Sequence, residues 1–219
     1  VGKTITVENV EKIGQAVGSE ARARKLSTVA IGRDGRLSGQ ELSQALARGI
    51  QKSGVDVIDV GMVATPMLYY AAHELCQYSG VMVTGSHNPP EYNGFKIVLG
   101  GTTLSADTIQ ALRIRIENND LTQGSGQYSE HNIAKVYAER ITSTIKLARP
   151  MKVVVDCGNG VAGAFAPALY RELGCEVIEL FCYVDGTFPN HHPDPSAPKN
   201  LQDFIQKLKS ILQQQKFDK

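Results

Sequence analysis

Hydrophobic residues recur at two different spacings along the first 150 residues, and the two spacings alternate. Apolar positions three or four residues apart predict helices near 6–17, 42–50, 65–75, 105–116 and 133–148. Short apolar or alternating runs predict strands at 28–32, 55–60, 80–84 and 95–99. We expect Thr65 to be the N-cap of the third helix, with Pro66 as its first residue, and Ser105 to cap the fourth.

The same alternation begins again after Pro150. Strands are expected at 152–156 and 175–181, joined by a glycine-rich turn and a helix that ends near 173. A proline-rich loop over 185–198 then leads into a last helix from about residue 200. The pattern predicts an α/β fold: a mixed, largely parallel sheet flanked by helices over 1–149, with one antiparallel addition, plus a partial second α/β domain over 150–219.

Composition excludes several classes of protein. Hydrophobic residues are 42% and charged residues 21% of the chain, as in ordinary globular proteins. Lys and Arg number 23 against 22 Asp and Glu, and the basic residues are scattered, so bulk charge favours neither nucleic acid nor an anionic membrane as a partner. No apolar run approaches the ~20 residues of a membrane span, and residues 1–12 lack the core of a signal peptide, so we expect a cytoplasmic protein.

The cysteines give no sign of a metal or redox motif. None of the four forms a CxxC pair, and each lies in or beside a predicted helix or strand. We therefore expect reduced, buried, structural thiols at Cys76, Cys157, Cys175 and Cys182.

One loop concentrates polar chemistry: VTGSHNPPEYNGFK, residues 83–96. Ser86 follows the end of a strand, where its hydroxyl could be a nucleophile, a phosphate carrier, a metal ligand or a simple turn residue. The nucleophile elbow of hydrolases needs a helix directly after the serine, and Pro89 and Pro90 prevent a clean start. Phosphoryl transfer fits better, because His87 and Lys96 supply a proton relay and positive charge beside the hydroxyl.

The segment TGSHNPPEYNGFK (84–96) resembles the phosphoserine loop of the α-D-phosphohexomutases, most closely the bacterial phosphomannomutase/phosphoglucomutase group. Four further segments support the resemblance, which extends to about residue 203: GRDGRLSG (32–39), DVGMVATP (59–66), VVVDCGNGVAG (153–163) and FPNHHPDP (188–195).

The resemblance implies a reaction and its partners. Ser86 would carry the phosphoryl group, and an oxygen of that group would also bind Mg²⁺. The phosphoserine would phosphorylate a mannose or glucose 1- or 6-phosphate, the bisphosphate would turn round, and its other phosphate would return to Ser86. Glucose 1,6-bisphosphate would act as the activator.

The resemblance also implies the residues of the site. His87 would serve in acid–base catalysis and Lys96 in charge stabilisation, while Asn88 would orient the loop. We expect Arg33 and Arg36, in the RDGR segment, to contact the phosphoserine region.

A rival fingerprint lies in DCGNGVAG, residues 156–163. Gly158, Gly160 and Gly163 have GxGxxG spacing between a predicted strand and a helix, and Glu179 lies near the end of the next strand. This pattern is typical of NAD(P)-binding oxidoreductases. The same glycines also suit the tight turn of any βαβ unit, so an oxidoreductase domain remains the alternative.

Other parts that the resemblance implies are absent from the 219 residues: an Asp-rich DGDGDR loop for Mg²⁺, a sugar-recognition GEMSG loop and a phosphate-binding Ser/Arg loop. The chain also begins at Val1 rather than Met.

We therefore expect the N-terminal portion of a phosphohexomutase, inactive or weakly active alone. A non-catalytic fragment that binds a hexose phosphate or a partner is the other hypothesis, and exposed apolar surface could allow self-association.

A histidine pair in the proline-rich loop could suggest a metal site. His191, His192 and Asp194 match no common zinc spacing, and adjacent histidines point in different directions. We expect a hinge or a surface loop there.

Overall fold

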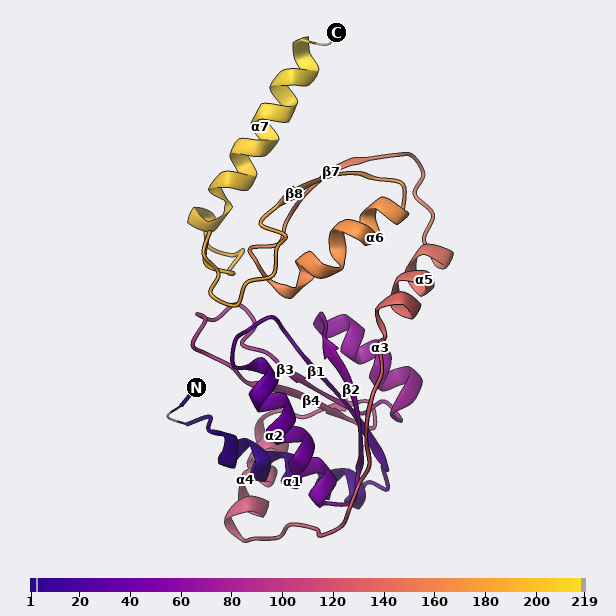
Figure 1. Ribbon diagram of the computed structural model, residues 1–219, viewed down its shortest axis with the longest axis vertical. Helices are drawn as coiled ribbons and strands as arrows, with labels where there is room; N and C mark the ends of the chain where they lie inside the picture. Colours follow the sequence, from indigo (N-terminus) through magenta and orange to yellow (C-terminus); the bar gives the residue numbers. More distant parts are fainter. Residues whose placement is uncertain (3, 218–219) are drawn as a thin grey trace. The chain divides into compact units, whose positions relative to one another are not determined.

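The computed structural model describes residues 1–2 and 4–217 (Figure 1), and for 215–217 it describes the backbone alone. Two compact units make up the chain. The first contains 1–86 and 91–137, and the second contains His87–Pro90 together with the chain from Ala138 onwards. Among the described helices, none is both long and apolar enough to cross a membrane.

The first unit is built on a six-stranded mixed sheet with the strand order β5-β4-β3-β1-β2-β6. Strand β1 pairs in parallel with β2 and β3, and β2 pairs in parallel with β6. Strand β4 is antiparallel to both β3 and β5. The strands are β1 Thr28–Arg33, β2 Asp56–Met62, β3 Gly80–Val83, β4 Phe95–Leu99, β5 Thr102–Thr103 and β6 Tyr128–Glu130.

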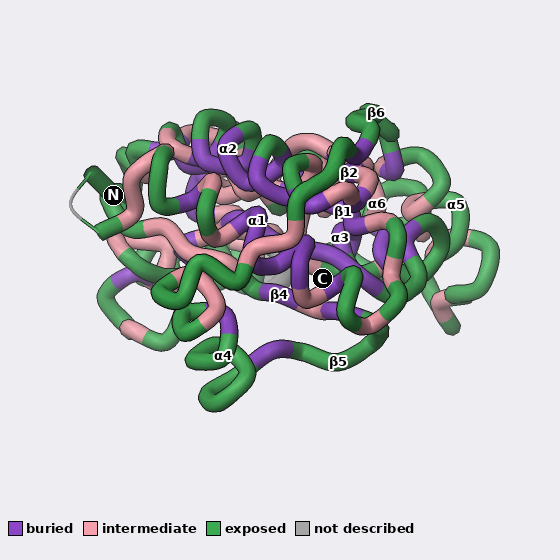
Figure 2. The backbone as a smooth tube through the Cα atoms, turned by 90° about the horizontal axis from the view of Figure 1, so that it is seen from below, coloured by how far each residue is buried: buried purple, intermediate pink, exposed green. Residues whose placement is uncertain are grey.

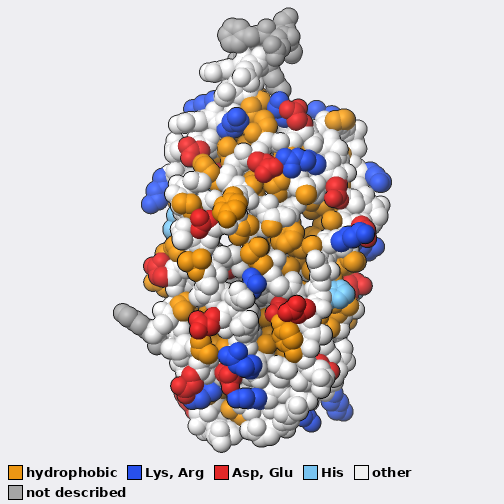
Figure 3. Space-filling model, in the orientation of Figure 1, with side chains coloured by type: hydrophobic (Ala, Val, Ile, Leu, Met, Phe, Trp, Pro, Cys, Tyr) orange, Lys and Arg blue, Asp and Glu red, His pale blue; other side chains and the backbone are white. Residues whose placement is uncertain are grey.

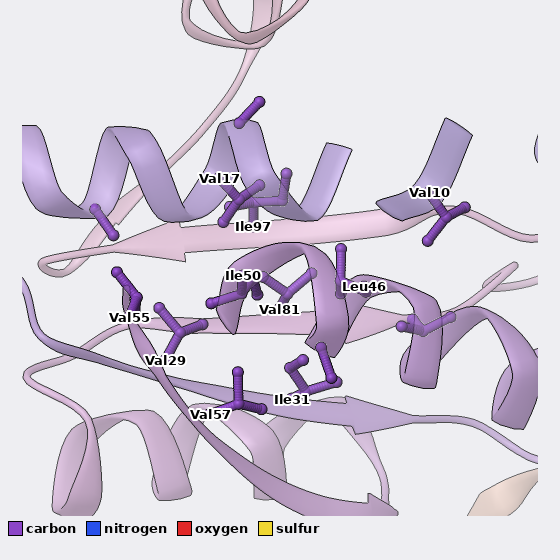
Figure 4. Packing of buried hydrophobic residues seen from close by; sticks show 14 of the residues in the cluster. Val10, Val17, Val29, Ile31, Leu46, Ile50, Val55, Val57, Val81 and Ile97 are labelled. Carbon is purple, nitrogen blue, oxygen red and sulfur yellow. The ribbon is translucent and has the colours of Figure 1, made fainter. Parts of the chain in front are cut away.

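Helices cover both faces of this sheet (Figure 1). Alternate strand residues such as Val29, Val81 and Ile97 form one buried cluster with residues of α1, α2 and α4 (Figure 4). On the other face α3 packs against strand glycines: a Cβ at Gly80 would lie 3.2 Å from the Cβ of Ala72. The helices are α1 Val7–Ala23, α2 Gly39–Lys52, α3 Thr65–Leu75, α4 Ala106–Glu117 and α5 Ala134–Thr144, the last of which crosses the division between the units.

The core lies where the sequence periodicity places it. Figure 2 shows the buried backbone concentrated in the central strands and along α1 and α2. The two helices approach each other closely because glycines lie at their contact. A Cβ at Gly49 would lie 2.0 Å from the carbonyl oxygen of Glu11, and one at Gly14 would lie 2.3 Å from that of Leu46. A side chain at either position would force the helices apart.

The predicted fold class is confirmed, with corrections in detail. Thr65 is not the N-cap of α3: Ala64 is extended (φ −74°, ψ 150°), and its carbonyl accepts the Met67 N–H bond at 2.9 Å. Pro66 is therefore the second helical residue. Ser105 does cap α4, in a capping box with Thr108.

Two edge strands and one helix end also differ from the prediction. All residues of β6 are exposed, and β5 consists of two exposed residues. Neither strand therefore has the apolar alternation from which a strand can be predicted. Helix α5 ends at Thr144 instead of near 148. None of its residues is fully buried, so little burial of apolar side chains is available to stabilise a further helical turn.

The second unit contains a parallel pair of strands, β7 and β8. No residue of either strand is fully buried. Met151, Tyr170 and Tyr183 of this unit are exposed, and Figure 3 shows apolar side chains at the molecular surface. The predicted domain boundary at Pro150 stays a prediction. The elements are β7 Lys152–Asp156, the 3-10 turn η1 Val161–Ala164, α6 Ala166–Glu172, β8 Glu176–Leu180, the 3-10 turn η2 Pro198–Leu201 and α7 Gln202–Phe217.

The contact between α1 and α2 predicts the effect of one methyl group. Gly49→Ala should lower the free energy of unfolding by about 2 kcal/mol in urea denaturation, because overpacking a rigid contact outweighs the gain of up to ~1 kcal/mol in helix propensity. Gln44→Ala, on the exposed face of the same helix, should change it by less than about 0.5 kcal/mol. Greater stability of Gly49→Ala would contradict the close approach.

Candidate phosphoserine loop

Ser86 lies just beyond the carboxyl end of β3 in a conformation that non-glycine residues seldom adopt. Its φ is +53°, in the left-handed region, and the residue is exposed. Two hydrogen bonds hold this backbone: its N–H donates to Thr84 Oγ1 at 2.9 Å, and its carbonyl accepts from Arg36 Nη2 at 2.9 Å. No described residue hydrogen-bonds the Ser86 hydroxyl. The backbone is therefore fixed while the hydroxyl faces solvent.

Arg36 joins the two ends of the loop that follows. Its side chain is fully buried, and Nη1 donates to the carbonyl of Tyr92 at 3.0 Å while Nη2 donates to that of Ser86. The planar guanidinium presents donors in several fixed directions, which the single ammonium of lysine cannot do. The loop lies tightly against it, since a Cβ at Gly85 would lie 2.4 Å from the guanidinium carbon.

Asp34 balances this buried charge and orders the start of the loop. Its Oδ2 accepts hydrogen bonds from Arg36 Nε at 3.3 Å, from the Thr84 hydroxyl at 2.7 Å and from the Gly85 N–H at 3.3 Å. Its Oδ1 accepts the Arg36 backbone N–H at 3.0 Å. A carboxylate that receives several N–H and O–H donors is well compensated for its burial.

The topology of the sheet explains why these residues meet. Strands β1 and β3 are adjacent and parallel, with Arg33 opposite Val83, so the segments that follow them leave the same edge of the sheet. Asp34 and Arg36 follow β1, and Thr84 and Ser86 follow β3. The sequence prediction missed Asp34 and Thr84, although each lies at or within two residues of the end of a predicted strand.

Two further cations lie near this edge of the sheet, Arg33 on β1 and Lys96 on β4. Lys96 lies opposite Met82 in the β3–β4 pair and is exposed. Arg33 is the last residue of β1 and is partly buried. Neither side chain has a hydrogen-bond or ion-pair partner among the described residues. Both positive charges are available to an anion at this edge of the sheet.

His87 and Asn88, the next two predicted site residues, group with the second unit. In that unit, hydrogen bonds from Ser196 lower the pKa of Asp194, and the positive charge of His87 lowers it further. The interactions that fix Ser86 therefore come from Arg36, Asp34 and Thr84.

Two of the three glycines of the rival fingerprint have packing roles, and the third lies in a turn. Gly158 has φ +48°, and a Cβ there would lie 2.9 Å from the His191 ring; one at Gly163 would lie 1.9 Å from the carbonyl oxygen of Cys182. Gly160 precedes a 3-10 turn, and α6 begins only at Ala166. Glu179, the acidic residue of that pattern, pairs with Arg171. These roles account for the glycines, but they do not test the oxidoreductase alternative.

His191 is part of an ion pair within the second unit. Its Nδ1 donates to the carbonyl of His192 at 3.0 Å, and its Nε2 lies 3.1 Å from Asp156 Oδ1. Burial lowers the pKa of His191, but these two hydrogen bonds and the charges of Asp156 and Asp203 outweigh it, so the pKa is raised. Only the imidazolium can donate from both nitrogens, which explains the direction.

The Mg²⁺ implied by the resemblance was tested against the donor set. Among the described residues no group of three or more His, Cys, Asp or Glu side chains could hold a metal ion. Mg²⁺ prefers several oxygen ligands, and Ser86 supplies one. The described residues therefore do not form a complete magnesium site.

Comparisons with known proteins agree over nearly the whole chain. Two family models match: "Phosphoglucomutase/phosphomannomutase, alpha/beta/alpha domain I" over residues 1–123 and the corresponding domain II over 128–215. A phosphomannomutase/phosphoglucomutase of Pseudomonas aeruginosa is 59% identical over 210 residues, which are 96% of this chain and 45% of that protein. A phosphoglucomutase of Neisseria meningitidis serogroup B is 55% identical over 212 residues, 96% of this chain and 46% of that protein.

A solved structure gives the same result. The phosphoglucomutase/phosphomannomutase family protein of Burkholderia thailandensis has a TM-score of 0.93 and 52% sequence identity, over 96% of this chain and 48% of that one. The chain thus spans about half the length of the curated relatives it matches.

The buried Arg36–Asp34 pair predicts a large cost for losing the guanidinium. Arg36→Gln should lower the free energy of unfolding by about 3 kcal/mol, because it leaves the mostly buried Asp34 without its cation and two carbonyls without their donor. Arg113→Gln, which breaks an exposed pair with Glu117, should cost less than about 0.5 kcal/mol. Equal small effects in denaturant unfolding would show that Arg36 is not needed to hold the loop.

The ion pair of His191 predicts a pH dependence. The pKa of His191 is raised in the folded state, so protonated His191 stabilises the fold. This stabilisation is fully present below the unfolded pKa of about 6.5 and is lost as pH rises through the folded pKa. Unfolding free energy measured from pH 6 to 9 should therefore fall more in the wild type than in His191→Asn. Identical slopes for the two proteins would contradict the assignment.

Proposed function

Because the chain belongs to the phosphoglucomutase/phosphomannomutase family, we propose that Ser86 is the residue that carries a phosphoryl group to and from a hexose phosphate. One observation carries the proposal: a solvent-facing serine hydroxyl on a backbone fixed in the left-handed region by Arg36 and Thr84. Phosphoryl transfer depends mainly on positioning and charge stabilisation, so a fixed carrier is what the reaction needs.

The proposed reaction has two half-reactions. In the first, the bond between phosphorus and Ser86 Oγ breaks as phosphorus bonds to a sugar hydroxyl, whose proton passes to a base. In the second, the sugar's other phosphate returns to Ser86 Oγ, and the freed sugar oxygen takes up a proton. The sugar leaves with its phosphate on the other carbon, and the serine is again phosphorylated.

We extend the proposal to the residues around Ser86. His87 is the proposed acid and base, and Asn88 orients the loop tip. Lys96 and Arg33 have no partner among the described residues, which supports a role in neutralising the transferring phosphoryl group. Arg36 differs from these two, because its donors are used on the carbonyls of the loop. We assign it as a positioning residue.

The names of the relatives support glucose and mannose phosphates as the substrate class. Glucose 1,6-bisphosphate is the proposed donor that first charges Ser86. Mg²⁺ is proposed as the metal ion of the whole family protein.

Phosphate mapping tests the proposal. The purified chain should gain about 80 Da, one phosphoryl group, after incubation with glucose 1,6-bisphosphate, and peptide mapping should place it on Ser86. Ser86→Ala should lose the modification. Ser125→Ala, which changes an exposed turn serine of the same unit, should keep it.

Two results would contradict the assignment of Ser86. One is an unmodified wild-type chain; the other is a phosphate that remains in Ser86→Ala. A circular dichroism spectrum and a urea midpoint should accompany each variant, so that a loss of phosphate is not confused with a loss of fold.

A further inference from the structure

Two thiols in the second unit lie in direct contact, far from Ser86 in sequence. Cys157 is the first residue after β7, and Cys182 follows β8 by two residues. Their Sγ atoms are 3.3 Å apart although the residues are 25 positions apart in the chain. Both are partly exposed, whereas Cys76 and Cys175 are buried. All four cysteines are free, as expected, but the expectation that they are buried is wrong for this pair.

The backbone around the two thiols keeps them together. The Cys157 N–H donates to the carbonyl of Leu180 at 3.0 Å, and the Asn159 N–H donates to that of Phe181 at 2.8 Å. The Asn159 side chain donates to the carbonyl of Tyr183 at 2.9 Å. These bonds join the two segments that follow β7 and β8 on both sides of the sulfur contact. The thiols thus face each other from fixed segments.

We propose that Cys157 and Cys182 are an oxidant-responsive dithiol that closes to an intramolecular disulfide when a hydroperoxide reaches it. The sulfur of one thiolate attacks a peroxide oxygen, the O–O bond breaks, and the sulfenic acid forms as the other oxygen leaves as water or an alcohol. The second sulfur then bonds to the first, and the S–O bond breaks to release water. The two thiols lose two electrons and two protons, and the peroxide is reduced.

The surroundings favour a slow first step and a fast second one. Burial raises the pKa of both thiols, and the partner thiol, Asp156 and Glu179 raise that of Cys157 further. Near neutral pH both therefore remain protonated and react slowly with a peroxide. Once one sulfur is oxidised, the other is already in contact with it, so ring closure is intramolecular and should precede further oxidation. The pair is reduced at rest and closes under oxidant.

The proposal is independent of Ser86 and is tested by mass spectrometry of the full chain. After treatment with hydrogen peroxide and blocking of free thiols, a non-reducing digest should contain one peptide pair joined through Cys157 and Cys182. The joined pair should weigh about 2 Da less than the two thiol peptides together. Dithiothreitol should restore the separate peptides.

Variants distinguish this pair from other oxidation. Cys157→Ser and Cys182→Ser should each lose the linked peptide, while Cys76→Ala, which removes a buried thiol elsewhere, should keep it. If a serine variant does not fold, the wild-type digest alone decides, because it shows which sulfurs are joined. Three results would overturn the proposal: a link that includes Cys76 or Cys175, a link only between chains, or separate oxidation of the two thiols to sulfinic acids without any link.

Discussion

The geometry of the phosphoserine loop depends on one buried charge pair. Arg36 donates to the carbonyls at both ends of the loop, and Asp34 accepts from Arg36, Thr84 and Gly85. A buried guanidinium without a carboxylate would be strongly destabilising, and a carboxylate there without its donors equally so. Each partner therefore makes the other possible, and together they hold Ser86 at φ +53° with its hydroxyl exposed. The strain of that backbone, of order 1–3 kcal/mol, is offset by bonds that exist only in this arrangement.

The charge pair in turn depends on the sheet. Strands β1 and β3 must be adjacent and parallel for the residues that follow them to leave the same edge. Their register is set by the apolar cluster beneath α1 and α2, and a slip of one residue would move that cluster to the other face. The helices can cover the cluster closely because Gly14 and Gly49 lie where they meet. The pattern of apolar residues therefore determines the packing of the core, the packing determines the strand register, and the register determines the position of Ser86.

Much of this could be predicted from the sequence, for physical reasons that also explain the failures. Long apolar periodicities predicted the helices and central strands, since burial of a face is what fixes those elements. Strand β6 was missed because it is polar and exposed, and only pairing with β2 makes it a strand. Arg36 was predicted at the site, but its role was not, because nothing local shows that it reaches Tyr92. The contact between Cys157 and Cys182 was not predicted, because only the pairing of β7 with β8 brings the two thiols together.

We infer that Arg36 prepares Ser86 for phosphoryl transfer by fixing the loop and not by binding the phosphate. A direct test is the initial rate of Ser86 phosphorylation by glucose 1,6-bisphosphate in the wild type and in Arg36→Gln. The rates are measured without urea, at a temperature where both proteins are folded. We expect the rate to be at least tenfold lower in Arg36→Gln, which corresponds to about 1.4 kcal/mol in the barrier. The bisphosphate concentration that gives half the maximal rate should change little. An unchanged rate, or a loss confined to the half-saturating concentration, would contradict it.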